Sequence, residues 1–269
     1  MQNKIFFAFV ICCLVPFQVF TKNHSTSISQ VVEAVNTTQC FFIPPENWEI
    51  TDPQSLSEQV KIAFLKNNGN GFCPSINLAI EETDVSLVDY LKAVKAIHEQ
   101  DRKNHWRTLG KVRTHSGLAQ LTEIDSTSEW GPVRILQLIF LKEGHAYVLT
   151  AASLKEEFSN YYKDIQSAFR SFTLSNDLFS HIPQLEQREM LKQKQAELYT
   201  MAEEHLHSST TEKTLFENQT FREKGWTSFQ KFVLDNFKDM GAYWQILILR
   251  EAYEKLLCLK APELSTETH

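Results

Sequence analysis

Side chains capable of chemistry are scattered along this sequence, and none stands at the spacing of a known catalytic or metal-binding motif. The sequence contains no GxSxG, P-loop or HExxH pattern. Gly69 and Gly71 lack the third glycine of a dinucleotide-binding fingerprint, and no two cysteines have the CxxC spacing of zinc or redox sites. We therefore predict no catalytic residues, no cofactor and no metal, and a protein that is not an enzyme.

Three polar clusters have explanations that require no catalytic or metal site, and the one around His98 is expected to be a solvated helix face. His98 is the only histidine at the end of an expected helix. His205 and His207 are two residues apart on a second expected helix, so their side chains point about 200° apart and cannot share one ion. The carboxylates at 81–84 precede a helix, whose dipole favours negative charge at that end.

Three cysteines lie beyond the first 21 residues: Cys40, Cys73 and Cys258. An exported protein can oxidise its cysteines, and an odd number leaves one thiol over. Cys40 and Cys73 flank expected strands and form our candidate disulfide. The alternative is three buried thiols.

The N-terminus has the pattern of a secretory signal peptide. Lys4 precedes an apolar run at residues 5–17, which is shorter than the roughly 20 apolar residues of a membrane span. We predict a signal peptide at residues 1–21 and a polar tether at residues 22–39, and hence an exported protein, periplasmic or secreted. The alternative is an uncleaved helix that anchors the protein in the inner membrane.

The composition indicates a packed protein. The chain has 269 residues, 42% of them hydrophobic, with only eight glycines and eight prolines. Its net charge is −6, and both signs are mixed along the chain. This balance argues against a nucleic-acid-binding protein, which usually has a basic face.

The strongest strand signal lies in the middle of the chain. A polar loop expected at 126–131 leads into residues 132–141, which alternate as a strand that is mostly apolar on both faces. Such a strand is typical of the centre of a sheet that is covered by two layers. A hairpin turn at 142–145 joins it to a partner strand at 146–151.

A helix is expected directly after this hairpin. Ser153 and Glu156 have the spacing of a capping box, which predicts that the helix starts there. Its apolar stripe consists of Phe158, Tyr161, Tyr162, Ile165, Ala168, Phe169 and Phe172. We expect this helix, alone or beside an earlier one, to cover one face of the sheet. The helices beyond residue 183 are available for the other face.

The residues before the hairpin supply further strands and one helix. Strands at 60–65 and 75–82 flank a turn rich in glycine and asparagine. A helix capped by Ser86 follows, and strands at 106–115 and 118–125 come next. Strands joined by such short turns indicate an antiparallel sheet.

The C-terminal part changes character. Residues 183–260 predict a helical region whose last part is divided by Gly241, and residues 261–269 a disordered tail. Four aromatic residues form a stripe at helical spacing: Trp226, Phe229, Phe232 and Phe237. Such a stripe is either part of a core or an interaction face. We treat it as a candidate interaction face.

Three segments carry a family resemblance: the opening Phe41-Phe42-Ile43-Pro44-Pro45-Glu46-Asn47-Trp48, the helix segment Leu87-Val88-Asp89-Tyr90-Leu91, and the strand Ala146-Tyr147-Val148-Leu149-Thr150-Ala151 closed by an aromatic helix. Their order resembles the PsbP-like fold, which extrinsic photosystem subunits, the Ran-binding Mog family and small exported bacterial proteins share. The resemblance implies an α+β fold at 40–175, an antiparallel sheet sandwiched by helices (α/β/α), with the helical region following it. No Ran-binding or photosystem residue set can be carried over to this sequence.

Members of this family are mostly noncatalytic binding or assembly factors. Together with the leader, the resemblance implies an exported binding or assembly factor whose partner is another protein and not a nucleic acid. Membrane contact is expected only through the N-terminal segment, if that segment is not cleaved. The alternatives are an enzyme whose site is built from dispersed residues and a membrane-surface protein held by the N-terminal helix.

Overall fold

The computed structural model of the protein describes residues 39–69, 71–208 and 215–259. The chain divides into two compact units, one that ends at Leu174 and one that begins at Ser175. The predicted signal peptide, nearly all of the tether and the predicted tail lie outside the described residues. None of the described helices is long and apolar enough to cross a membrane.

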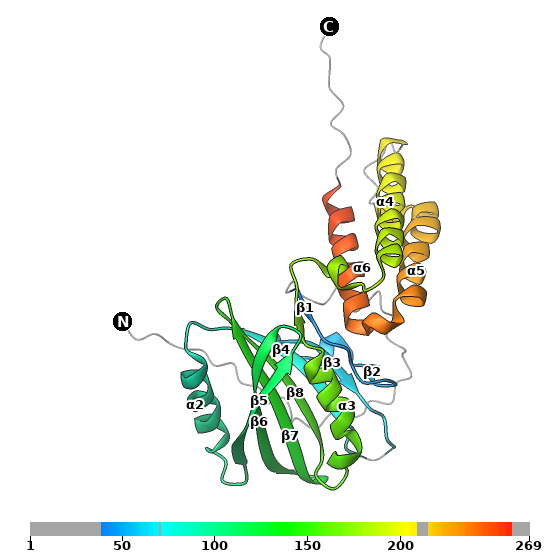
Figure 1. Ribbon diagram of the computed structural model, residues 1–269. Coiled ribbons are helices and arrows are strands. Elements are labelled where there is room, and N and C mark those ends of the chain that lie inside the picture. Colours follow the sequence, from blue (N-terminus) through cyan, green and yellow to red (C-terminus); the bar gives the residue numbers. More distant parts are fainter. Residues whose placement is uncertain (1–38, 70, 209–214, 260–269) are drawn as a thin grey trace. The chain divides into compact units, whose positions relative to one another are not determined.

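The first unit is built on an antiparallel sheet. Its described strands number seven and follow the order β2-β3-β4-β8-β7-β6-β5 (Figure 1). These strands are β2 (Glu49–Ile50), β3 (Val60–Leu65), β4 (Ser75–Glu82), β5 (His105–Thr114), β6 (Gly117–Ser128), β7 (Gly131–Lys142) and β8 (His145–Leu154). A separate pair joins β1 (Cys40–Phe41) to β9 (Thr173–Leu174). The predicted antiparallel α+β fold, with a helical region after it, is confirmed.

The predicted hairpin between β7 and β8 is confirmed, with a turn of two residues. Glu143 and Gly144 both have positive φ, 53° and 76°. This is the backbone of a type I′ turn, whose twist matches that of the strands. Lys142 therefore pairs directly with His145.

One face of the sheet is covered by α2 (Leu87–His98). Tyr90 and Val94 of this helix pack with Ile139 of β7 and Val148 of β8. The predicted cap is confirmed, because the Ser86 hydroxyl accepts a hydrogen bond from the Asp89 backbone amide.

The opposite face is covered by α3 (Phe158–Arg170) and by Phe172, which follows it. Phe172 contacts Phe140 of β7 and Tyr147 of β8, with ring centroids 5.8 Å apart in both pairs. Because Phe140 and Ile139 are neighbours on one strand, they point to opposite faces. The sheet is thus sandwiched by α2 and α3. The expectation that the late helices are needed as the second cover is wrong, since α2 supplies it.

Two local expectations are corrected by strand pairing. Ser153 does not cap a helix. It lies in β8, is fully buried and pairs with Arg134 of β7. The helix α3 begins only after Glu157, whose side chain makes no capping hydrogen bond. The polar loop expected at 126–131 is also wrong, because β6 and β7 leave only residues 129–130 between them. In both cases a strand ladder extends over a polar sequence: across the β7–β8 pair for Ser153, and across the tight β6–β7 hairpin for residues 126–128.

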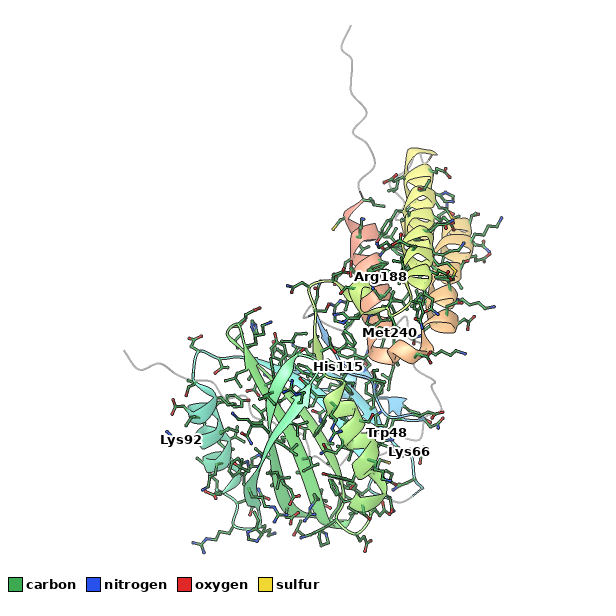
Figure 2. All side chains as sticks on the ribbon, in the orientation of Figure 1. Trp48, Lys66, Lys92, His115, Arg188 and Met240 are labelled. Carbon is green, nitrogen blue, oxygen red and sulfur yellow. The ribbon has the colours of Figure 1, made fainter. Side chains whose placement is uncertain are left out.

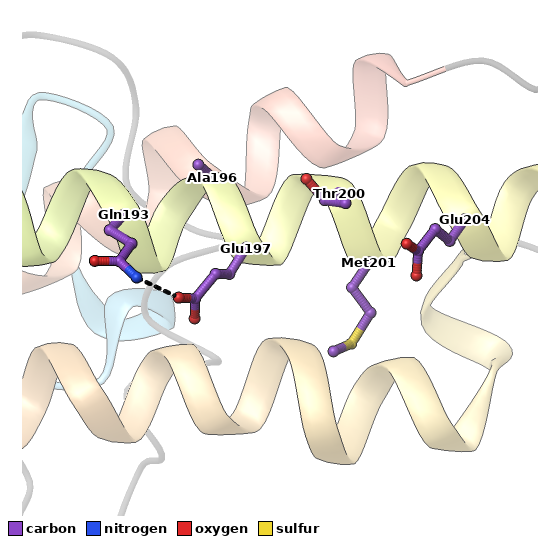
Figure 3. Close-up of a pocket in the computed structure, with 6 residues that line it drawn as sticks. All are labelled: Gln193, Ala196, Glu197, Thr200, Met201 and Glu204. Carbon is purple, nitrogen blue, oxygen red and sulfur yellow. Dashed lines mark hydrogen bonds between the residues drawn. The ribbon is translucent and has the colours of Figure 1, made fainter.

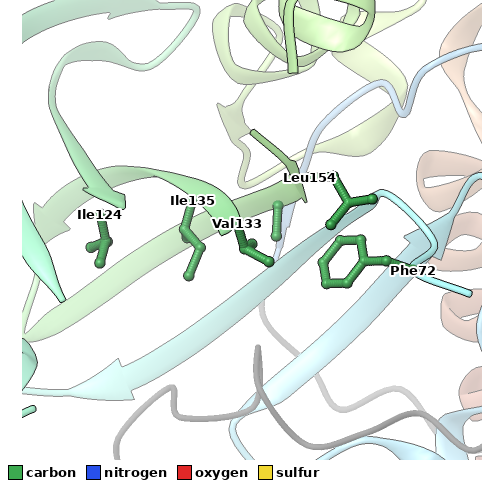
Figure 4. Packing of buried hydrophobic residues seen from close by; sticks show 6 residues of the cluster. Phe72, Ile124, Val133, Ile135 and Leu154 are labelled. Carbon is green, nitrogen blue, oxygen red and sulfur yellow. The ribbon is translucent and has the colours of Figure 1, made fainter. Parts of the chain in front are cut away.

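An apolar cluster lies further along the strands on the face that α2 covers. Its buried residues are Phe72, Ile124, Val133, Ile135, Ala152 and Leu154 (Figure 4). Trp106 of β5 packs against this cluster and also against the α2 cluster. The indole therefore links the two apolar groups.

A row of polar side chains crosses the sheet between these two clusters. Asn77, Thr150, Gln137 and Thr122 pair in register on β4, β8, β7 and β6. All four are buried, with exposed fractions of 8% or less. One side-chain oxygen of each has no hydrogen-bond partner within the described structure. These groups are costly to bury, so the row is a weak point of the core.

The second unit is helical. Its helices are α4 (Leu185–Ser208), a π-helix (Phe221–Thr227), α5 (Ser228–Asn236) and α6 (Ala242–Cys258), with three short 3-10 turns (Leu178–His181, Leu215–Glu217 and Lys238–Met240). Gly241 has a φ of 83° and separates the last two helices. The predicted break at this glycine is confirmed.

Candidate functional site: a basic depression beside α3

A depression of about 560 Å³ lies on the outer side of α3 in the first unit. The residues that line it are Ile43, His115, Tyr162, Lys163, Gln166, Ser167, Arg170 and Ser171. His115 stands at the turn between β5 and β6, and Figure 2 labels it. Three parts of the chain that are distant in sequence therefore meet here.

The helix presents its lining residues because of their spacing. Phe158, Ile165 and Phe169 are buried against the sheet. Lys163 lies between these positions and Arg170 directly follows the last of them; both side chains are exposed. The same amphipathic pattern that anchors α3 thus places Lys163 and Arg170 on its outer face, where Asp164 is exposed as well.

Hydrogen bonds hold the rim of the depression together. The Ile43 amide donates to the Ser171 hydroxyl at 2.7 Å, and this hydroxyl donates to the Ala168 carbonyl at 2.7 Å. The His115 amide donates to the Arg170 carbonyl at 3.1 Å. This last hydrogen bond satisfies one donor and one acceptor of the main chain, and it fixes His115 and Arg170 relative to each other.

The lining is basic and partly apolar. Lys163 and Arg170 are cationic, His115 adds an imidazole, and no carboxylate is among the lining residues. Ile43 is 40% exposed and Tyr162 is 46% exposed, although both are large hydrophobic side chains. The arrangement suits a ligand that offers carboxylates together with an apolar contact.

A second charged group of the first unit is internally paired. Arg134 Nε lies 2.8 Å from Asp125 Oδ1, and Lys155 Nζ lies 2.7 Å from Asp125 Oδ2. The hydrogen bond from Arg134, with further help from Lys155, lowers the pKa of Asp125 to about 2. Glu123 beside them bonds Arg107 and Arg134. These charges satisfy one another, so the group is structural.

Two other buried ionisable groups also pair locally. The Tyr90 hydroxyl donates to Glu81 at 2.8 Å, and burial raises the pKa of Glu81. Burial also raises the pKa of Tyr90. His98, expected on a solvated face, is partly buried instead, and this burial lowers its pKa. None of these residues lines the depression. The described residues hold no group of three or more histidine, cysteine or carboxylate side chains placed to bind a metal.

A groove of about 380 Å³ in the second unit is lined by α4 alone (Figure 3). Its residues are Gln193, Ala196, Glu197, Thr200, Met201 and Glu204. Gln193 and Lys194 both donate hydrogen bonds to Glu197, at 3.0 and 2.7 Å. Gln193 and Glu197 of this groove thus bond to each other along one helix, and all of the lining residues come from that helix.

The aromatic stripe of the second unit belongs to its core. Trp226, Phe229 and Phe237 are at most 7% exposed. Trp226 packs on Tyr253, and Phe237 packs on Trp244. Phe232 is partly buried and contacts Phe237. This packing contradicts the prediction of an exposed interaction face, because the helices of the unit cover one another's apolar stripes.

The candidate disulfide is not formed. Cys40 is buried in β1, whereas Cys73 is partly buried at the entrance to β4, and no disulfide joins them. Burial raises the pKa of the Cys73 thiol. Cys40 and Cys73 both stand next to strands in the sequence, but the fold does not bring them together, because β1 pairs with β9 and not with β4.

Sequence reasoning missed the depression, although a charge signal points toward it. Residues 102–122 contain no acidic residue. The same stretch holds five cationic residues: Arg102, Lys103, Arg107, Lys111 and Arg113. It leads directly through β5 into His115. In a chain of net charge −6 this segregation is the feature that could have indicated a basic surface.

No protein-family model matches the chain, and no curated protein is similar to it. Among solved structures, it is similar to cyanobacterial PsbP (CyanoP) from Synechocystis, with 13% identity and a TM-score of 0.39 over 51% of this chain and 87% of that one. It is also similar to LpqN, involved in cell envelope biogenesis of Mycobacterium tuberculosis, with 12% identity and a TM-score of 0.38 over 52% and 84%. The Ran-binding protein Mog1p of Saccharomyces cerevisiae gives 15% identity and a TM-score of 0.36 over 51% and 90%. Both families that the sequence resembles, PsbP and Mog, are represented here.

Proposed function

We propose that the protein is a noncatalytic binding factor that holds an acidic segment of a partner protein in the basic depression. One observation carries this proposal: Lys163, Arg170 and His115 converge with two exposed apolar side chains and with no carboxylate in the lining. A carboxylate-bearing segment would neutralise the cations and cover Ile43 and Tyr162.

The strength of such binding is modest. Exposed ion pairs contribute about 0.2–1 kcal/mol each, and salt screens them. Burial of Ile43 and Tyr162, which are 40% and 46% exposed, adds an apolar term that salt does not weaken. We therefore expect a transient complex whose affinity falls, but does not vanish, as salt is added.

The local chemistry supports binding over catalysis. The Ser171 hydroxyl is already engaged with Ile43 and Ala168. His115 Nδ1 lies 3.4 Å from the Thr173 hydroxyl, which itself donates to the Ser171 carbonyl. These hydroxyls hold the rim of the depression and are not presented to a substrate as nucleophiles.

We also propose that the protein acts after export, with residues 1–21 removed as a signal peptide. Support comes from Lys4 and the apolar run at 5–17. The mass of the mature protein from its native host tests this directly. A mature chain that still begins at Met1 would contradict cleavage and favour the anchored alternative.

Charge reversal tests the binding site. We predict that Lys163→Glu with Arg170→Glu raises the Kd for a fluorescent peptide of alternating glutamate and valine by roughly tenfold or more, because attraction becomes repulsion. Fluorescence anisotropy with the full chain measures the Kd. The matched control is Lys224→Glu with Lys231→Glu, two exposed positions of the second unit that give the same change in net charge. Equal loss in both double variants, or no binding by the wild type, would rule out this site.

A further inference from the structure

The strand β5 is an open edge of the sheet. It lies at the end of the strand order, and β6 is its only neighbour in the described sheet. It spans ten residues, and the five from Arg107 to Lys111 are all exposed. An edge of this length presents a row of backbone groups that another strand can pair with.

The register shows which backbone groups face outward. Thr114 and Gly117 flank a two-residue turn and pair with each other, and such a turn closes on a hydrogen-bonded pair. Because hydrogen-bonded and non-hydrogen-bonded pairs alternate along an antiparallel ladder, the amides of Val112 and Gly110 also face β6. The amides and carbonyls of Arg113 and Lys111 therefore point away from the sheet.

Cationic side chains stand on both faces of this edge. Arg107 is opposite Glu123 and forms an ion pair with it on the face that α3 covers. Lys111 and Arg113 are opposite Gln120 and Leu118, on the face that α2 covers. Neither Lys111 nor Arg113 has an ion-pair partner among the described residues. An added strand with an acidic residue at every second position would carry its carboxylates on one face, and on the α2 face they would lie beside Lys111 and Arg113.

The same charges disfavour pairing of this edge with the β5 edge of a second copy of the protein. A second copy of β5 would bring like charges together, and the bulge between Thr108 and Gly110 interrupts a flat pairing surface. Both features are known devices against self-association of edges. An acidic strand would be attracted where a second copy of β5 is repelled, so the edge selects its partner by charge.

We propose that an extended acidic segment of the partner adds to β5 as a further antiparallel or parallel strand along Gly110–Arg113, on the turn side of the bulge. This inference rests on the proposed function, because β5 runs into His115 at the rim of the depression. It adds the form of the ligand: a segment in β conformation, with free backbone amides and acidic side chains. Main-chain hydrogen bonds supply affinity, and the flanking cations supply selectivity.

Amide hydrogen exchange by NMR tests the pairing. On saturation of the full chain with the glutamate–valine peptide, we expect exchange at one or both of the Lys111 and Arg113 amides to slow by about tenfold or more. The amide of Val112, which faces β6, serves as the internal control and should change little. A second peptide carries N-methyl groups at two consecutive central residues, so that both of its edges lose a donor. We expect its Kd to be roughly tenfold higher, the equivalent of about one lost hydrogen bond.

The outcomes separate the two proposals. If charge reversal at Lys163 and Arg170 weakens binding but Lys111 and Arg113 gain no protection and the methylated peptide binds equally well, strand addition is wrong and the depression stands. If the edge amides gain protection while that charge reversal has no effect, the depression is wrong as the site. If the unmodified peptide does not bind, both proposals are overturned.

Discussion

At the scale of single residues, the unpaired hydroxyls in the core make a sharp prediction. Thr150 is 1% exposed, and its Oγ1 has no hydrogen-bond partner within the described structure. We predict that Thr150→Val stabilises the protein by about 1 kcal/mol, because it removes an unsatisfied buried group at constant shape. Urea unfolding measures this change.

Thr114 is the matched control for that substitution. It is also buried, at 5% exposed, but its hydroxyl donates to the Gly117 carbonyl and accepts from the Ser116 amide. Thr114→Val should therefore destabilise the protein by about 1–2 kcal/mol. Similar losses in both variants would mean that the Thr150 hydroxyl has a partner, such as a buried water.

Asp125 gives a prediction for acid stability. Its pKa is lowered to about 2 by Arg134 and Lys155, below the ordinary value near 3.9. A carboxylate with a lowered folded-state pKa stabilises the fold above its ordinary pKa, and this contribution is lost as the pH falls toward 2. We predict that Asp125→Asn costs about 1–2 kcal/mol at pH 7 and almost nothing near pH 2.

Unfolding free energies across that pH range test the Asp125 prediction. Asp164→Asn, at an exposed position on α3, is the control and should cost little at any pH. A constant gap between wild type and Asp125→Asn from pH 7 to pH 2 would show that the variant acts through packing and not through the ion pairs.

At the scale of elements, the cap of α2 decides how well one face of the sheet is covered. The Ser86 hydroxyl accepts from the Asp89 amide at 3.2 Å and donates to its carboxylate at 2.8 Å. We predict a loss of about 1 kcal/mol in unfolding free energy for Ser86→Ala. Ser159→Ala, at an exposed helical position of α3, should be neutral or slightly stabilising. Equal effects would show that the cap contributes nothing.

Elements governed by local chemistry could be predicted from the sequence. The alternation of 132–141, the Glu143-Gly144 turn and the Ser86 cap each have a cause within a few residues, and all three are present. The start of α3 could not be predicted, because Ser153 fits a capping box locally but is held in β8 by pairing with Arg134. Non-local ladders override a local signal of this kind.

What covers an apolar stripe is also a non-local property. The spacing of Trp226 and Phe229 indicates a helix with an apolar face, and this is what the structure has. Whether Tyr253 or a partner covers that face depends on how distant helices pack. For this reason the interaction-face interpretation was consistent with the sequence but wrong in the structure.

At the scale of the whole molecule, the candidate site is an assembly of distant segments. Ile43 and Ser171 meet across 128 positions of sequence, and His115 comes from a third segment. No spacing in the sequence could place them together. The segregation of cations at 102–122 could have been noticed, since it needs only a count of charges.

NMR shift mapping of the full chain with the glutamate–valine peptide tests the central claim most directly. We expect saturable shifts at His115, Lys163 and Arg170 and along β5, reduced by added salt. Shifts that centre on the α4 groove, or that are absent at His115 and Arg170 while the peptide binds, would contradict the claim that the basic depression is the binding site.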